Sequence, residues 1–449
     1  MRLPPREIAA ALGAEVVAEG DASPPHRAAI ASGDVAAGDL FFGLRGARRD
    51  GGEFAAAALD AGAWGAVVGP AFRDRFSGTE GRPYGWVFVV EDPLAAMHSL
   101  ARAWRRALGA RVVGVTGSVG KTSVKDIARA LLSGRVHANR ENLNTEIGLP
   151  LTLLEAPDDT DILVLEMAMR GAGQIAELAE IAEPDVAVIT NVGPVHVELL
   201  GSIEAIAAAK AEILDALHPG GTAVAPVEAG HLEPHLERAG RLLRFGPGGD
   251  VEARESRLVE GVTEALVATP LGEQSFHFPF AEAHNLTNAL AAIAAGVALG
   301  VPPAEMADRA ANIGFSRFRG ERLVLGDGIV LVNDCYNANP VSMRAALDHL
   351  ASLRARRTVA VLGEMGELGP EAAGYHRGVG EHARAAGVDL LIGVGLPARD
   401  YDPDELVADP GEAAVLLAAR LEPGDAVLVK GSRSAGLEAV AEQLPELIG

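Results

Sequence analysis

The residues with the clearest capacity for chemistry lie in the glycine-rich segment 117–122, which reads GSVGKT. The segment follows a short β-branched apolar run at 111–115, and helical periodicity follows it. In such a turn, backbone N–H groups and the positive helix end can bind phosphates, Lys121 can reach the terminal phosphates, and the Thr122 hydroxyl can hold Mg²⁺. The full Walker pattern has a glycine where this chain has Val115, so the shorter form G-x-x-G-K-T is present. We therefore predict a nucleotide site rather than a glycine-rich turn with a surface lysine.

Two more polar residues follow predicted strands. Glu166 ends the apolar run 162–165, and His196 follows the run 186–192 after a short loop. Open α/β sheets bind ligands at the carboxyl ends of their strands, where a carboxylate can hold Mg²⁺ directly or through water. Taken alone, Glu166 is equally well explained as a strand-end acid facing solvent. A lone loop histidine is more often a surface residue, so the interpretation of His196 depends on its neighbours.

Lys210 falls on the apolar stripe of a predicted helix at 203–217. A lysine in that position must extend its amine to the surface, pair with an acid, or lose its charge. The first outcome is the commoner one for an isolated lysine. A lysine carbamylated by CO₂ would instead be an anion able to bind a second metal ion.

Asn285 opens a predicted alanine-rich helix at 286–299, where a plain N-cap accounts for it well. Arg319 lies at the expected junction between the second and third parts of the chain. An arginine between domains is a candidate for neutralising phosphate, and equally for a simple interface salt bridge.

The last group of candidates follows a predicted strand at 329–333. Asp334 comes at its end, and Tyr336 and Asn337 lie in the amide-rich turn after it. Such a turn could contact a ligand or could be ordinary turn chemistry.

Elements that alternate between strand and helix must position these residues, which indicates an α/β protein with parallel sheets covered by helices. We expect a small mixed α/β domain at 1–91, a central P-loop domain with a parallel sheet at 92–314, and a Rossmann-like domain at 315–449. The stretch 222–280, rich in Val, Thr, Phe and Pro, predicts an added antiparallel element. Predicted strands lie at 39–44, 63–68, 85–90, 111–115, 161–165, 186–190, 329–333, 358–362, 389–394 and 425–429, and predicted helices at 54–62, 93–108, 123–133, 172–182, 203–217, 286–299, 342–353, 372–386 and 411–421.

Composition narrows the class of protein. The 449 residues carry 39 basic and 61 acidic side chains, a net charge of −22, which disfavours nucleic-acid binding because phosphate backbones are repelled. One cysteine, Cys335, and no signal-peptide pattern at the start lead us to expect a cytoplasmic location. The most membrane-like stretch, 289–301, is too short to cross a bilayer. We expect a monomer that does not insert into membranes.

Taken together and in order, these motifs resemble the Mur ligase family across essentially the whole chain, with a weaker N-terminal match at 38–46 (GDLFFGLRG). The resemblance implies an ATP-dependent amide ligase that adds D-Ala-D-Ala to UDP-N-acetylmuramoyl-tripeptide through an acyl phosphate, in peptidoglycan precursor synthesis. The matching segments are GSVGKT (117–122), ENLNTEIGLP (141–150), LEMAMRGAGQIAEL (165–178), ITNVGPVHVELLGS (189–202), AKAEI (209–213), AHNLTNAL (283–290), NDCYNANPVSM (333–343), LGEMGELG (362–369) and LVKGSRS (428–434).

The resemblance also implies roles for single residues. It gives one Mg²⁺ to Thr122 and Glu166, a second to His196 and Glu166, and a carbamylated lysine to Lys210. Asn285 matches an adenine contact, and the N-terminal domain would hold the UDP group. The implied catalytic residues are Lys121, Glu166, His196, Lys210 and Arg319, and the implied nucleotide contacts, shared in part with the incoming dipeptide, are Gly117, Ser118, Val119, Gly120, Lys121, Thr122, Asn285, Arg319, Asp334, Tyr336 and Asn337.

The chain departs from the family pattern in places. Residues 31–33 read Ala-Ser-Gly where Asp-Ser-Arg is usual, 50–52 read Asp-Gly-Gly where Asp-Gly-His is common, and 144–145 read Asn-Thr where two asparagines are common. Val119 stands where the loop usually has a polar residue. Three alternatives remain: a sister ligase that adds a single amino acid, a regulatory P-loop NTPase, and a non-catalytic nucleotide-binding protein. Against the second, the chain has no guanine-reading Asn-Lys-x-Asp motif.

Overall fold

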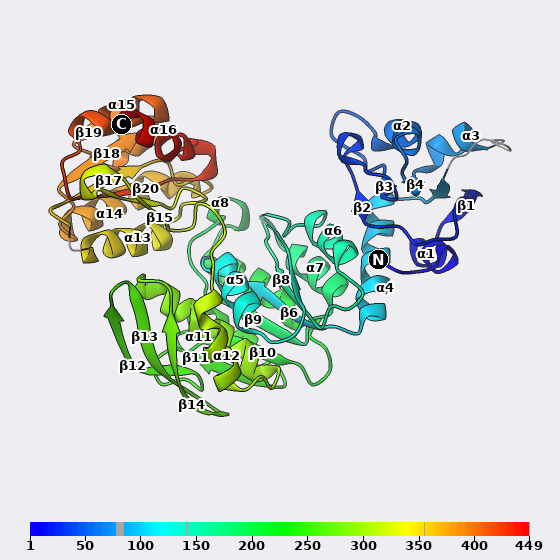
Figure 1. Ribbon diagram of the computed structural model, residues 1–449, viewed down its shortest axis with the longest axis horizontal. Coiled ribbons are helices and arrows are strands. Elements are labelled where there is room, and N and C mark those ends of the chain that lie inside the picture. The colour runs from blue at the N-terminus through cyan, green and yellow to red at the C-terminus, as the bar shows by residue number, and fades with distance from the viewer. Residues whose placement is uncertain (78–84, 141, 354, 449) are drawn as a thin grey trace.

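The computed structural model describes residues 1–77, 85–140, 142–353 and 355–448, which form an α/β protein of three domains, as predicted. Figure 1 shows the N-terminal and C-terminal domains at opposite ends, with the central domain between them. The N-terminal sheet has the order β1-β5-β4-β3-β2, parallel except for β1 against β5. Its elements are α1 (Pro5–Leu12), β1 (Glu15–Ala18), β2 (Ala28–Ala29), β3 (Leu40–Phe42), α2 (Ala55–Asp60), β4 (Gly65–Val68), α3 (Arg73–Phe76) and β5 (Trp86–Val89).

The central domain is built on a parallel sheet of order β11-β10-β9-β6-β8-β7, whose middle strands are continuous apolar runs buried on both faces. The strand before the glycine-rich loop, β6, lies between β8 and β9, so the ends of all three meet at one edge. Its helices are α4 (Pro93–Leu108), α5 (Lys121–Leu131), α6 (Gly148–Glu155), α7 (Gln174–Ala182), α8 (Val197–Leu200), α9 (Ile203–Ala211), α10 (Glu233–Leu236), α11 (Ala283–Ala298) and α12 (Pro303–Arg309), and its strands are β6 (Arg111–Thr116), β7 (Val136–Ala138), β8 (Ile162–Glu166), β9 (Val186–Ile189), β10 (Thr222–Pro226) and β11 (Leu242–Phe245).

The antiparallel element expected within 222–280 is present but begins later than predicted. Strands β12 (Glu252–Val259), β13 (Val262–Thr269) and β14 (Gly272–Phe278) form it. The residues before them add β10 and β11 to the central sheet instead, because these short buried runs pair in parallel beside β9. The helix predicted at 203–217 is also shorter, since α9 ends at Ala211 and a 3₁₀ turn follows.

The C-terminal domain has a sheet of order β15-β16-β20-β17-β18-β19, parallel except for β15 against β16. Helices cover both of its faces, as the Rossmann-like expectation requires. Its elements are β15 (Glu321–Val324), β16 (Val330–Asn333), α13 (Pro340–Ser352), β17 (Arg357–Leu362), α14 (Ala372–Ala385), β18 (Leu390–Val394), β19 (Glu405–Val407), α15 (Pro410–Arg420), β20 (Asp425–Lys430) and α16 (Glu438–Ile448).

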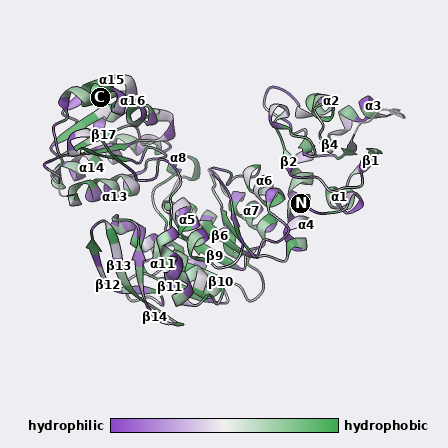
Figure 2. Cartoon of the chain, in the orientation of Figure 1, coloured by the Kyte–Doolittle hydropathy of each residue, from purple (hydrophilic) through white to green (hydrophobic). Residues whose placement is uncertain are grey.

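Helix α4 packs against both α1 and the central helices α6 and α7. As a result, one hydrophobic cluster runs from Trp86 of the N-terminal domain through Met97 and Leu100 to Leu149 of the central domain. Apolar residues concentrate on the strands and on the helix faces turned toward them (Figure 2). Among the described residues, no helix is both long and apolar enough to span a bilayer.

Candidate active site

The glycine-rich loop takes a shape that its two glycines make possible. Gly117 has φ 148° and Gly120 has φ 81°, and helix α5 begins at Lys121, two residues earlier than predicted. A Cβ atom at Gly117 would lie 1.9 Å from Thr190 Oγ1, and one at Gly120 would lie 2.4 Å from Asn288 Oδ1. Side chains are therefore excluded at both positions, and the backbone N–H groups stay accessible at the positive end of α5.

The segment after β9 supports this loop from the side. The Ser118 hydroxyl accepts from the Gly193 N–H at 2.9 Å, and the Val119 N–H donates to Asn191 Oδ1 at 3.0 Å. The loop that carries His196 is thus bound directly to the glycine-rich loop.

Thr122 and Glu166 meet at the end of β6 and β8. The Thr122 hydroxyl donates to Glu166 Oε2 at 2.8 Å, while Asn144 Nδ2 donates to Glu166 Oε1 at 2.9 Å. Glu166 is 3% exposed, so its interpretation as a strand-end acid facing solvent is wrong. The parallel pairing of β6 with β8 is what brings the carboxylate beside the loop.

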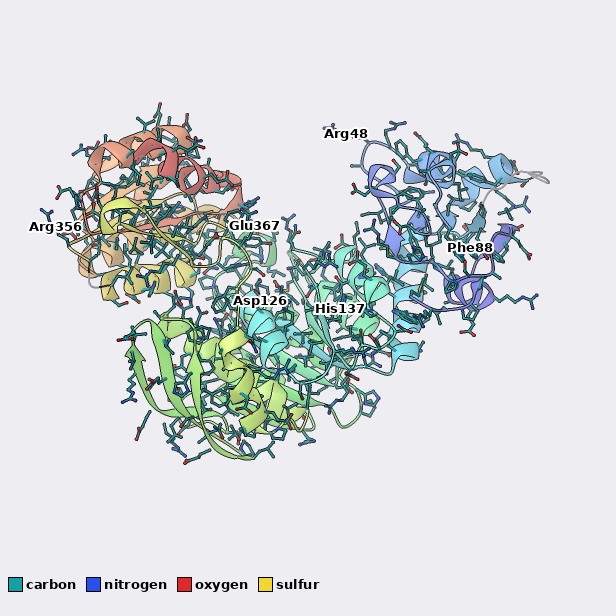
Figure 3. The ribbon with its side chains drawn as sticks, viewed as in Figure 1. Arg48, Phe88, Asp126, His137, Arg356 and Glu367 are labelled. Carbon is teal, nitrogen blue, oxygen red and sulfur yellow. The ribbon has the colours of Figure 1, made fainter. Side chains whose placement is uncertain are left out.

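Arg319 reaches this pair from the segment that leads into the C-terminal domain. Its Nη2 donates to Thr122 Oγ1 at 3.1 Å, and its guanidinium carbon lies 4.0 Å from the centroid of the Tyr336 ring. Its Nε is buried and has no hydrogen-bond partner among the described residues. Asp126 (Figure 3) fixes the segment, because its Oδ2 accepts from both the N–H and the hydroxyl of Ser316 at 2.8 Å. The described residues give Arg319 no carboxylate partner, so the interface salt bridge is not found.

Two lysines lie in the same region without a carboxylate in contact. Lys121 Nζ donates to the Gly117 carbonyl at 2.8 Å; burial lowers its pKa and the nearby Arg319 charge adds to this, while Glu166 opposes it. Lys210 is 2% exposed and makes no hydrogen bond or ion pair to any described residue. Burial, together with the charge of Lys121, holds the pKa of Lys210 well below its usual value. Lys210 therefore neither extends to the surface nor pairs with an acid.

His196 lies at the start of α8 in a left-handed conformation, with φ 57°. Its Nδ1 forms a hydrogen bond with Glu367 of the C-terminal domain. Burial lowers the pKa of the His196 ring, and Lys121 and Lys210 also lower it through their charges, whereas Glu367 raises it. The ring is thus within the field of both lysines, and it is not an ordinary surface histidine. Sequence reasoning quoted the segment that contains Glu367 but gave it no role.

Asn285 does not cap its helix. The N-cap of α11 is Glu282, and Asn285 lies inside the first turn, so the N-cap interpretation is wrong. Its side chain is 5% exposed, its Nδ2 donates to Glu282 Oε2 at 3.2 Å, and its Oδ1 accepts from Asn288 Nδ2 at 3.1 Å. Asn288 in turn packs against Gly120, which connects this helix to the glycine-rich loop.

Asp334 and the turn after it are organised by a buried lysine that sequence reasoning also left without a role. Lys430 Nζ donates to Asp334 Oδ2 at 2.5 Å and to the Asn337 carbonyl at 3.1 Å. Burial lowers the pKa of His284 in the first turn of α11, and the charge of Asp334 opposes this shift. Tyr336 joins the same group through Arg319. The structure therefore brings the C-terminal candidates to the central domain.

The donor atoms near the loop suit a small hard cation in part. Thr122 and Glu166 offer adjacent oxygens beside a phosphate-binding turn, which fits Mg²⁺ with phosphate and water completing its ligands. Across the described part of the chain, no three His, Cys, Asp or Glu side chains converge on one point. A complete protein cage for a metal is thus not present there.

Comparison with known proteins finds two family models that match the central and C-terminal parts of the chain. The model of the Mur ligase middle domain matches residues 115–296, and that of the Mur ligase glutamate ligase domain matches 317–433. A UDP-N-acetylmuramoyl-tripeptide–D-alanyl-D-alanine ligase of Synechocystis is 39% identical over 91% of this chain and 90% of its own length. The chain belongs to the Mur ligase family. Among solved structures, MurF of Acinetobacter baumannii matches this Mur ligase with a TM-score of 0.88 and 28% identity over 99% of both chains.

A second solved relative concerns the nucleotide. MurF ligase of Thermotoga maritima, solved in complex with ADP, has a TM-score of 0.83 and 31% identity over 94% of this Mur ligase and 98% of its own chain.

Proposed function

We propose that the chain is an ATP-dependent ligase that joins D-alanyl-D-alanine to UDP-N-acetylmuramoyl-tripeptide. The observation that carries this is the hydrogen-bonded series Arg319–Thr122–Glu166 at the end of the glycine-rich loop, in a chain 39% identical to a ligase of that name. The ADP-bound Thermotoga relative supports ATP as the nucleotide.

The reaction has two steps. The terminal carboxylate of the tripeptide attacks the γ-phosphorus of ATP, forming an acyl phosphate as ADP leaves. The amine of the dipeptide then attacks the acyl carbon, the tetrahedral intermediate loses phosphate, and an amide remains after the nitrogen gives up a proton. Every substrate group near the γ-phosphate except the amine is an anion, so positive charge must be held there.

In this chain, two cationic side chains can supply that positive charge. Lys121 lies over the loop that would bind the β- and γ-phosphates, and Arg319 approaches the same point from the C-terminal side. The Nε of Arg319 is buried without a hydrogen-bond partner among the described residues, and we expect a phosphate oxygen to accept from it when ATP is bound. Burial strengthens these interactions, because water competes less for the charges.

One Mg²⁺ would be held by Thr122 and Glu166, and a second Mg²⁺ would be held by His196 and Glu166. When bound, the metal neutralises phosphate charge and raises the electrophilicity of the γ-phosphorus. We further propose that Lys210 is carbamylated. The structural support is that Lys210 is buried without a partner among the described residues and is repelled by the charge of Lys121. A carbamate on Lys210 would be negatively charged, so Lys121 would attract it.

The remaining assignments follow the domain division 1–91, 92–314 and 315–449. Asn285 would contact adenine, Asp334 and the turn with Tyr336 and Asn337 would contact nucleotide or dipeptide, and the N-terminal domain would bind the UDP group. A monomer acting in the cytoplasm stays our prediction.

The decisive experiment measures ADP release by the purified protein with a panel of acceptors. We expect release to require both UDP-N-acetylmuramoyl-tripeptide and D-Ala-D-Ala, and Lys121→Ala to abolish it. Equal rates with a single amino acid would favour a sister ligase. Full-rate phosphate release without the dipeptide would indicate an NTPase and overturn the proposal.

A further inference from the structure

Glu367 is the one described side chain that touches the His196 ring through a hydrogen bond, and it comes from another domain. It lies in the loop after β17, and Figure 3 shows it where the C-terminal domain meets α8. One oxygen of the Glu367 carboxylate accepts a hydrogen bond from His196 Nδ1, and the other lies 3.7 Å from Arg170 Nε. Both partners belong to the central domain, so one carboxylate joins two domains.

The loop that carries Glu367 is held firmly by its own domain. Three of the four residues that precede Glu367 have backbone groups that are hydrogen-bonded by side chains from three separate parts of the C-terminal domain. The bonds run from the Tyr401 hydroxyl to the Gly363 carbonyl (2.8 Å), from the Met365 N–H to His376 Nε2 (3.0 Å), and from the Gly366 N–H to Ser432 Oγ (2.8 Å). A loop fixed in this way can place a carboxylate at a defined point.

The contact surface is also shaped for close approach. Glu367 has φ 60° and His196 has φ 57°, both in the left-handed region that side chains rarely adopt. Gly369 has φ 65°, and a Cβ there would lie 3.3 Å from the Glu198 backbone in α8. Two unfavourable backbone conformations facing each other across a domain junction are typical of a functional contact.

The bond has a direct consequence for the histidine. Because a carboxylate accepts at Nδ1, the proton of the ring must lie on that atom, and Nε2 presents its lone pair. Nε2 has no hydrogen-bond partner among the described residues. Carboxylates that bond one ring nitrogen commonly orient histidines whose other nitrogen acts on a ligand.

We propose that Glu367 is a positioning residue, which fixes the orientation and tautomer of His196 when the C-terminal domain lies against the central domain. The effect on catalysis that we expect from this positioning rests on the proposed function. By this means the site becomes complete when the domains are joined, because the C-terminal domain supplies the group that orients a central-domain side chain.

The test compares Glu367→Ala, Glu367→Gln and the matched control Glu371→Gln, which changes an exposed glutamate of the same segment. We expect Glu367→Ala to lower kcat by about 10-fold to 100-fold with KM for ATP within about twofold. The glutamine amide oxygen can still accept from Nδ1, so Glu367→Gln should recover much of the loss, and the control should match the wild type.

A second readout does not depend on turnover. Long-range ¹⁵N NMR of ¹⁵N-histidine protein, with the His196 signal identified by its loss in His196→Gln, reports which ring nitrogen carries the proton. We expect the Nδ1–H form in the wild type and a mixture in Glu367→Ala. An unchanged tautomer, a kcat within about twofold in Glu367→Ala, or equal losses in the Gln and Ala variants would overturn the proposal. If the wild type lacks ligase activity but its His196 tautomer still differs from that in Glu367→Ala, the result contradicts the proposed function and leaves the positioning role intact.

Discussion

At the scale of single residues, Lys210 is the group whose environment is hardest to reconcile with its usual chemistry. An ammonium buried without a partner and near another lysine is disfavoured twice, by desolvation and by repulsion. The neutral amine is the form that reacts with CO₂. The chain has four lysines, Lys121, Lys125, Lys210 and Lys430, so a carbamate can be assigned with few competitors.

For Lys210 we expect Lys210→Ala to lower kcat by more than about 100-fold, because the site would lose the anion that the proposed carbamate would supply. Bicarbonate should raise the rate of CO₂-depleted wild type and leave Lys210→Ala unchanged. ¹³C NMR in ¹³C-bicarbonate should show a carbamate signal that is missing in the variant. A wild-type spectrum without that signal would argue against carbamylation.

Cys335 gives a prediction on pH. Burial, helped by the charges of Glu438 and Asp334, raises the pKa of its thiol from a usual 9.0 to about 12. The native thiol should thus resist a disulfide reagent at pH 8 and react once the protein is unfolded in urea. Rapid labelling of the folded protein would contradict this.

The same pKa shift predicts a stability trend. Between pH 9.0 and about 12 the unfolded chain loses a proton that the native state keeps, so the free energy of unfolding falls as pH rises, by at most about 1.4 kcal/mol per pH unit. Urea unfolding at pH 8 and pH 10 should show a smaller decline for Cys335→Ala than for the wild type.

At the scale of elements, the sequence predicts the bounds of a helix well where residues next to its ends cap it. The predicted helix at 93–108 matches α4, which begins after Asp92, whose side chain accepts from the first N–H groups, and ends before Gly109, which has a left-handed conformation. Asn285 was misplaced because Glu282 starts α11 one turn earlier. The short strand β7 and helix α6 were missed, since three residues show no period and α6 is apolar on all sides.

The glycine-rich turn allows a sharp test at this scale. Gly120→Ala would force a left-handed alanine whose Cβ meets Asn288, so we expect a loss of about 1–2 kcal/mol in stability and weaker ATP binding. Gly171→Ala is the matched control, since a Cβ there has no atom within 4 Å. Thermal unfolding and titration with a fluorescent ATP analogue measure both effects, and equal behaviour of the two variants would refute the argument.

At the scale of the whole molecule, sequence reasoning could name the groups but not bring them together. Arg319 and Thr122 are 197 positions apart, and His196 and Glu367 are 171 apart. No period or local pattern encodes such a pair, because it depends on how the C-terminal domain sits on the central one. Glu367 was therefore missed although its segment had been recognised as part of the family pattern.

Arg319 allows that domain contact to be tested. Arg319→Ala removes the bond to Thr122 and the contact with Tyr336, so we expect a larger radius of gyration by small-angle scattering and a kcat reduced by about 10³-fold. Arg319→Lys keeps the charge but loses the planar fork, and should recover only part of the rate. Unchanged scattering in Arg319→Ala would show that the contact does not hold the domains together.

The hydrophobic cluster that α4 shares between the N-terminal and central domains has a consequence for substrate choice. Two domains with one continuous core keep a constant separation, whereas the C-terminal domain has separate cores and meets the central domain through polar contacts such as Glu367–His196. If the N-terminal domain binds the UDP group, as we propose, the substrate must bring its terminal carboxylate to the phosphate-binding loop across a fixed distance. On that proposal, an acceptor whose peptide is one residue shorter or longer would hold its carboxylate away from the loop, and we expect it to be a poor substrate whatever its side chains.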